Sequence, residues 1–296
     1  SMDDECNRLI RDDFLYEQAP SSSLCTSILA LHGNSKTCAE LLLELCNKLS
    51  QKLGMSEEID NNLLISIICQ LLYHAKLKFT NCEETHGVEL CDTYMSRVEL
   101  VKFLIESNFY EVPSIEDLMS SQTARRLRDK LIENESLALA MEVTTKCGLD
   151  PGAVWGAWGL AYLQVGKFKE AREKFSKFLK PSERGKTTQG NIRYVKMIID
   201  ILETSPMVSF DYLTVGDLAA SLTSLRELAK NSSANRVMDP KRFEECIFYL
   251  NTYGSYSGVV TFYVSHNHLK LACRFILDKR CPADIFTEHL LMPAIR

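Results

Sequence analysis

The stretch of sequence that decides the fold is VWGAWGLAYLQVGKFKEAREKFSKFLKP, residues 154–181, which contains both tryptophans of the chain. Gly159 and Ala171 are small residues, suited to positions where two antiparallel helices cross closely, and Gly166 supplies a turn between them. The large residues of the stretch recur at helical spacing and fill the space between two such helices: Trp155, Trp158, Tyr162, Phe168 and Phe175. The spacing therefore predicts a helical hairpin in which the tryptophans are packing residues.

The same order of residues is that of the tetratricopeptide repeat, Trp-x-x-Leu-Gly-x-x-Tyr followed by Ala-x-x-x-Phe and Pro. Trp158 takes the Leu place, and Pro181 comes slightly early. Weaker copies of the frame occur upstream and downstream: Leu131, Leu137 and Ala140, then Tyr263, Leu269 and Ala272. Because a single repeat cannot bury its own face, the sequence predicts an all-α fold. We expect an α-solenoid of stacked antiparallel helical hairpins that is tetratricopeptide-like in its centre.

Apolar residues recur at intervals of three and four along almost the whole chain, which is the helical period. A first group of helices is predicted at 3–18, 23–32, 35–53, 57–79 and 87–108, with Ser35 as the N-cap of the third. A second group is predicted at 114–120, 122–132, 136–147, 151–165, 167–179, 187–204, 211–230, 240–253, 256–265 and 267–278. Residues 1–110 are therefore expected to form an N-terminal helical bundle or the start of the solenoid. Residues 111–296 are expected to form the tetratricopeptide-like part, and the chain is interpreted as a fragment of a larger protein.

Composition excludes several classes of protein. The chain of 296 residues is 46% hydrophobic and 25% charged, as globular proteins are, and its formal charge of −5 gives no positive field that would attract nucleic acid. Its eleven cysteines include no C-x-x-C pair, so Cys82, His86 and Cys91 do not make a structural zinc site. The longest apolar run, LLISIICQLL, is shorter than the ~20 residues of a membrane span. These features predict a cytoplasmic protein that binds no nucleic acid.

Motifs of catalysis are missing from the sequence. It contains no phosphate-binding loop, no dinucleotide-binding glycine motif and no H-E-x-x-H. GSYSG at residues 254–258 resembles a nucleophile elbow only superficially, because Tyr256 stands at its centre. His266 and His268 are two positions apart and have no evident third ligand. We therefore expect a protein that is not an enzyme and holds no metal and no cofactor.

The basic residues of the central stretch allow two interpretations. Lys167, Arg172 and Lys174 alternate with Glu170 and Glu173, a pattern typical of a solvated helix face. Alternatively, Lys167 and Arg172 converge with Arg193 on a basic groove, and the chain is a free-standing tetratricopeptide module that captures peptide tails. In either case Trp155→Ala is expected to destabilise the fold by about 3–5 kcal/mol, as the truncation of large buried aromatic residues does.

Three segments carry a resemblance to a known family: YEVPSIEDLM at 110–119, residues 125–181 and residues 245–295. Together they resemble the spastizin family of FYVE-domain centrosomal proteins, in the helical C-terminal region that follows the FYVE finger. The sequence lacks the paired C-x-x-C ligands and the R-[RK]-H-H-C-R stretch of that finger. The resemblance therefore implies no direct lipid binding by this chain.

The resemblance also implies a setting. Spastizin-like proteins are scaffolds of endosomal and lysosomal trafficking, autophagic lysosome reformation and cytokinesis. It implies spatacsin and the fifth adaptor-protein complex as protein partners. It implies a peripheral location on late endosomes and lysosomes, and also at the centrosome and midbody. On this interpretation the chain is a non-catalytic protein-interaction segment.

Overall fold

The computed structural model describes residues 4–9, 29, 31, 33–53, 60–109, 112–183, 185–204 and 239–295. Over these residues it is mostly helical and contains no strand, apart from an isolated bridge between Glu183 and Lys186. The all-α prediction is therefore confirmed. The helix predicted at 211–230 lies outside the described residues, as do most of those predicted at 3–18 and 23–32.

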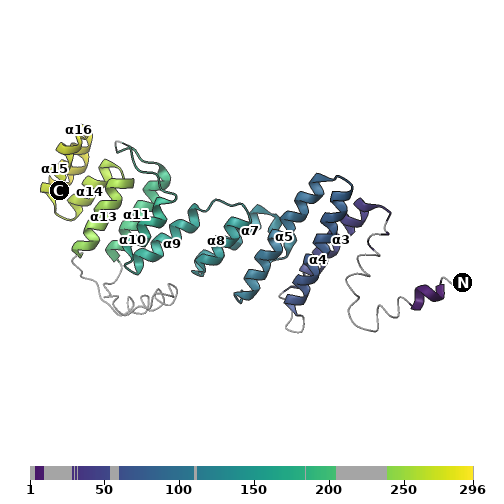
Figure 1. The fold of residues 1–296 in the computed structure, drawn as a ribbon. Coiled ribbons are helices and arrows are strands. Elements are labelled where there is room, and N and C mark those ends of the chain that lie inside the picture. Colours follow the sequence, from purple (N-terminus) through teal and green to yellow (C-terminus); the bar gives the residue numbers. More distant parts are fainter. Residues whose placement is uncertain are drawn as a thin grey trace. The chain divides into compact units, whose positions relative to one another are not determined.

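The described helices follow one another along the chain (Figure 1). Those of the first part are α3 (Ser35–Ser50), α4 (Asn61–Asn81), α5 (Thr85–Glu106), α6 (Ile115–Met119), α7 (Ser121–Glu133) and α8 (Leu137–Lys146). They are followed by α9 (Gly152–Gln164), α10 (Phe168–Ser176), α11 (Gln189–Thr204), α13 (Pro240–Tyr253), α14 (Tyr256–Ser265) and α15 (Leu269–Lys279). Beyond the last predicted helix come α16 (Ala283–Ile285), a π-helix η1 (Phe286–Leu291) and α17 (Met292–Ile295), which the sequence did not indicate.

The chain divides into two compact units. The first comprises residues 1–128 and 142–149, and the second comprises residues 129–141 and 150–296. The sequence pattern had placed a division at residue 110. The chain thus passes between the units three times: within α7, within α8 and before α9.

In the first unit α4 packs against α3 and α5, and α6 packs against α3 and α5. The buried face of α3 consists of small and medium apolar residues: Cys38, Ala39, Leu42, Leu43 and Cys46. The N-cap of α3 is Asn34, whose side-chain oxygen accepts a hydrogen bond from the Thr37 N–H at 3.1 Å. The assignment of Ser35 as N-cap was wrong by one residue, and Asn34 has the extended backbone that an N-cap requires.

By its length and composition, α4 could cross a membrane. The longest apolar run within it, LLISIICQLL, is shorter than the helix itself. Ile68, Leu72 and Ala75 on one of its faces are fully buried. Core helices of globular proteins meet the same two criteria, and α4 packs against neighbours on both sides.

Seven of the described helices end in the same way, with a residue of positive φ after the last turn. These residues are Glu83 after α4, Asn108 after α5, Glu135 after α7, Gly148 after α8, Gly166 after α9, Asn267 after α14 and Arg280 after α15. At Gly166 the N–H bonds the carbonyl of Leu163, and the N–H of Lys167 bonds that of Tyr162. This Schellman pattern satisfies the last carbonyls of a helix and reverses the chain in few residues. It accounts for the short connections that follow these helices.

The second unit has its core between α9, α10, α11, α13, α14 and α15, with a contribution from η1. Its fully buried side chains include Phe175, Ile198, Tyr249 and Val260. The segment between α10 and α11 is held against the end of α13: the Ser182 N–H bonds the Thr252 carbonyl at 2.8 Å, and the Thr187 hydroxyl bonds the Tyr253 carbonyl at 2.7 Å.

Candidate protein-interaction site

Helices α9 and α10 form the hairpin of the central stretch, and glycine makes their close approach possible. A Cβ atom on Gly159 would lie 2.7–2.8 Å from three ring atoms of Phe175 in α10. A Cβ atom on Gly156 would lie 2.5 Å from the ring of Tyr194 in α11. Gly159 therefore sets the contact of α9 with α10, and Gly156 sets its contact with the following helix.

The variant Gly159→Ala is expected to lower the free energy of unfolding by about 1–3 kcal/mol, because the added methyl group overpacks a rigid ring contact. Urea denaturation of the wild type and the variant measures this difference. Gly190→Ala is the matched control, since a Cβ at that exposed position in α11 meets only the Thr188 hydroxyl, at 4.0 Å. A loss at Gly190 as large as that at Gly159 would contradict the assignment.

The two tryptophans form a stacked pair on α9. The centroids of the Trp155 and Trp158 rings lie 5.9 Å apart, with 17° between their planes. The Lys174 ammonium lies 5.0 Å and 4.7 Å from the two centroids, and the Lys177 ammonium lies 4.3 Å from that of Trp155. Both tryptophans are half-buried. Trp158 packs against the cluster of Leu137, Ala161 and Val165.

Half-burial lowers the expected effect of Trp155→Ala. We now expect a loss of about 2 kcal/mol, roughly half of what the full burial of a tryptophan gives, and the lost cation–π contacts contribute part of it. The larger loss expected from the sequence assumed that Trp155 is buried. Thermal and urea unfolding measure the difference, and a loss above that of Phe175→Ala would contradict the placement of Trp155 at the edge of the core.

The three basic candidates have different surroundings. Arg172 pairs with Glu245 of α13, with Nε to Oε1 at 2.8 Å and an Nη atom to Oε2 at 2.5 Å. Its guanidinium carbon lies 3.8 Å from the centroid of Phe248, and the hydrogen bonds to Glu245 raise the pKa of Arg172. Lys167, before α10, and Arg193, on α11, are exposed. Arg172 thus joins α10 to α13, which weakens the alternative of a basic peptide-binding groove.

A groove lies between α11 and α14 and encloses about 460 Å³. Its apolar lining comes from both helices and from the end of α13: Ile192, Val195, Ile199, Leu250 and Phe262. Lys196, Asp200 and Glu203 line it from α11. Ser257, Thr261 and Ser265, spaced four residues apart on one face of α14, line it with hydroxyl groups. The volume is within the ~300–1,000 Å³ range of ligand pockets.

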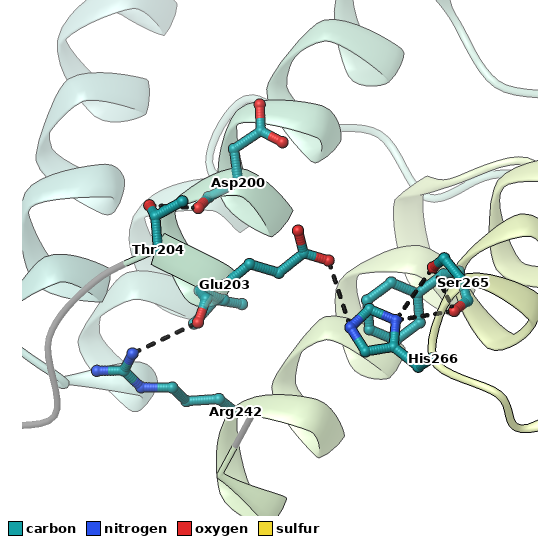
Figure 2. Close-up of polar contacts among 8 residues, drawn as sticks. Asp200, Glu203, Thr204, Arg242, Ser265 and His266 are labelled. Carbon is teal, nitrogen blue, oxygen red and sulfur yellow. Dashed lines mark hydrogen bonds and ion pairs between the residues drawn. The ribbon is translucent and has the colours of Figure 1, made fainter. Parts of the chain in front are cut away.

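Figure 2 shows the polar end of this groove, where Glu203 reaches toward His266. His266 Nε2 lies 3.6 Å from Glu203 Oε1, and its Nδ1 lies 3.0 Å from the carbonyl of Phe262 and 3.1 Å from the Ser265 hydroxyl. A carbonyl can only accept, so Nδ1 donates to Phe262 and has no lone pair to deprotonate Ser265. The Ser265 hydroxyl itself donates to the Phe262 carbonyl at 2.9 Å. The group therefore caps the end of α14 and does not activate a nucleophile.

Two motifs that the sequence had given no function contribute to this site. Gly254, Ser257 and Gly258 of GSYSG line the groove, and His266 lies at its polar end, whereas the ring of His268 packs 4.8 Å from that of Phe243. The four-residue spacing of the α14 hydroxyl groups is visible in the sequence. The face of α11 that lies opposite these hydroxyl groups cannot be recognised in the sequence, because the two helices are far apart along the chain. In the described part of the chain, no three His, Cys, Asp or Glu side chains are placed to hold a metal ion.

Comparison with curated proteins gives matches that cover almost the whole of this chain. The chain is similar to "Zinc finger FYVE domain-containing protein 26" of Rattus norvegicus, at 37% identity over 100% of the chain and 12% of that protein. The Homo sapiens protein of the same name is 36% identical, over 99% of the chain and 12% of its own length. A protein of Dictyostelium discoideum is 28% identical, over 97% of the chain and 13% of that protein. No protein-family model matches the chain, and no solved structure matches it.

Proposed function

From the premise that the chain is homologous over its whole length to spastizin, the zinc finger FYVE domain-containing protein 26, we propose that it is a non-catalytic interaction segment of a spastizin-like scaffold. The chain spans only 12% of the length of these relatives, so the activity of the whole protein is part of the proposal. We propose endosomal and lysosomal trafficking, autophagic lysosome reformation and cytokinesis as its setting. Spatacsin and the fifth adaptor-protein complex are the proposed partners.

The architecture we propose for this segment is an α-solenoid of tetratricopeptide-like hairpins. The observation that carries it is the double contact of α9, which packs on α10 through Gly159 and on α11 through Gly156. The α9–α10 pair is thereby covered on a face that it could not bury alone, and this burial by a neighbour is the physical requirement of stacked repeats. A groove between helices, such as that between α11 and α14, suits the binding of a protein segment.

Recruitment of the chain to late endosomes tests this function. The tagged 296-residue chain is expressed in cells with and without spatacsin and imaged beside a late-endosome marker. We expect puncta on late endosomes that disappear when spatacsin is removed, because protein contacts alone bring the chain there. A diffuse signal in both cell lines contradicts the proposed setting. Puncta that persist without spatacsin contradict spatacsin as the recruiting partner.

The charge test of partner binding must leave Arg172 intact. Reversing Arg172 would place a second carboxylate beside Glu245 and damage the fold. Lys167→Glu and Arg193→Glu change exposed residues only. We expect recruitment to survive this double change, since neither residue lines the groove between α11 and α14. Loss of recruitment in a variant that melts at the wild-type temperature would support the alternative in which Lys167 and Arg193 belong to a basic peptide-binding surface.

A further inference from the structure

We propose that the groove between α11 and α14 binds a segment of a partner protein that carries an apolar side chain close to a lysine or arginine. This inference rests on the proposed function, because it gives the chemistry of the partner that such a scaffold grips.

The shape and the lining of the groove account for the apolar side chain. Ile192 is 44% exposed at its mouth, while Val195, Leu250 and Phe262 are buried beneath. From Ile192 to Glu203 the wall of α11 is about 16 Å long at ~1.5 Å per residue. That length holds about five residues of extended chain at ~3.3 Å each, or three turns of helix. An apolar side chain entering here covers exposed isoleucine and reaches the buried floor.

Glycine on α14 keeps the groove open. A Cβ atom on Gly258 would meet only the Ser255 hydroxyl at 3.4 Å and a Leu250 methyl group at 3.7 Å, both of which are ordinary contacts. Gly258 and Gly254 both line the groove. Unlike Gly156 and Gly159, Gly258 is not required by a helix crossing, so a larger side chain there would occupy the groove without disturbing the core.

The charges of the groove account for the lysine or arginine. Asp200 and Glu203 lie within one turn of each other on α11 and bring two carboxylates to the end of the groove shown in Figure 2. Glu203 faces His266, whereas the Asp200 side chain points away from it. A partner ammonium or guanidinium placed there forms a charge-assisted hydrogen bond with the Asp200 carboxylate and is attracted by the negative charge of Glu203. The same lining holds one ammonium group, that of Lys196, against these two carboxylates, so a basic residue of the partner is still favoured. An acidic or phosphorylated segment would be repelled at the same place.

Selection of random 12-residue peptides displayed on phage, with the purified 296-residue chain as bait, tests the proposal. We expect the enriched peptides to share an apolar residue with a Lys or Arg within four positions of it. Synthetic copies are then titrated against the variants Asp200→Lys and Gly258→Leu. We expect the Kd to rise at least tenfold in each, by loss of charge complementarity in the first and by filling of the groove in the second.

Two matched variants serve as controls. Glu244→Lys reverses an exposed carboxylate on α13 outside the groove, and Gly190→Leu adds a side chain at an exposed position outside it. Both should bind the peptides as the wild type does, and circular dichroism melting confirms that all four variants fold. Failure to enrich any peptide, a consensus without a basic residue, or binding unchanged in Asp200→Lys would overturn the proposal.

The outcome separates this inference from the proposed function. Peptides whose binding survives both groove variants but is lost in Lys174→Glu would place the binding site on the tryptophan pair. The groove proposal would then be wrong and the scaffold function would stand. If peptide binding depends on the groove but the chain never reaches late endosomes, the groove proposal would stand and the proposed function would be wrong.

Discussion

Arg172→Met is expected to lower the free energy of unfolding by about 3 kcal/mol, the low end of the range for breaking a buried ion pair. Glu245 has only 4% of its side chain exposed, and Arg172 donates two hydrogen bonds to it, at 2.8 Å and 2.5 Å. Without the guanidinium, the carboxylate is left charged and buried. The Arg172 side chain is 42% exposed, so water can partly replace the guanidinium as a hydrogen-bond donor to Glu245. The expected loss of stability is therefore at the low end of that range.

Urea denaturation measures this loss against Lys169→Met, which removes an exposed charge from the same helix and should change the stability by less than about 0.5 kcal/mol. The double variant Arg172→Met, Glu245→Leu is expected to recover most of the loss, because it removes the stranded carboxylate together with its partner. A stability of Arg172→Met equal to that of the wild type contradicts the role of this pair in joining α10 to α13.

Phe175→Ala is expected to cost about 3–5 kcal/mol, the effect of truncating a fully buried aromatic residue. Phe175 is 0% exposed. Its ring lies under Gly159 of α9, and its centroid is 5.4 Å from that of Tyr249 in α13 in an edge-on arrangement. The side chain therefore joins three helices, and the cavity left by its removal cannot be closed by moving one of them.

Phe286→Ala is the matched control for this truncation, because Phe286 in the π-helix is 41% exposed. We expect a loss of about 1 kcal/mol or less there. Melting of Phe175→Ala within a degree or two of the wild type would mean that α9 and α10 are not held together by this ring, and the hairpin assignment would fail with it.

Local sequence order was enough to predict the helices of the central stretch. The spacing of Gly159, Ala171 and Phe175 reflects a contact between neighbouring helices, and such contacts leave a pattern within some twenty residues. Gly166 likewise predicts the turn between the two helices, because glycine adopts a positive φ without strain. The division into helices from 114 to 204 and from 240 to 278 followed from the same period of apolar residues.

Features that depend on distant residues could not be read from the sequence. The Arg172–Glu245 pair joins positions 73 residues apart, and nothing in either neighbourhood points to the other. The groove between α11 and α14 arises from two helices whose facing sides are set by packing of the whole unit. Glu83 and Glu135 adopt a positive φ after their helices although neither is glycine. The residue types at these positions therefore did not predict this kind of helix ending.

The measurement that tests the central claim most directly is a binding titration of the purified 296-residue chain with purified spatacsin. If the chain is an interaction segment of a spastizin-like scaffold, the two should bind with a Kd of about 1 μM or tighter, which corresponds to roughly −8 kcal/mol. Asp200→Lys should weaken that binding at least tenfold, while Glu244→Lys should leave it unchanged. The absence of binding at concentrations of about 100 μM, with both proteins folded, would contradict the claim that this segment binds spatacsin.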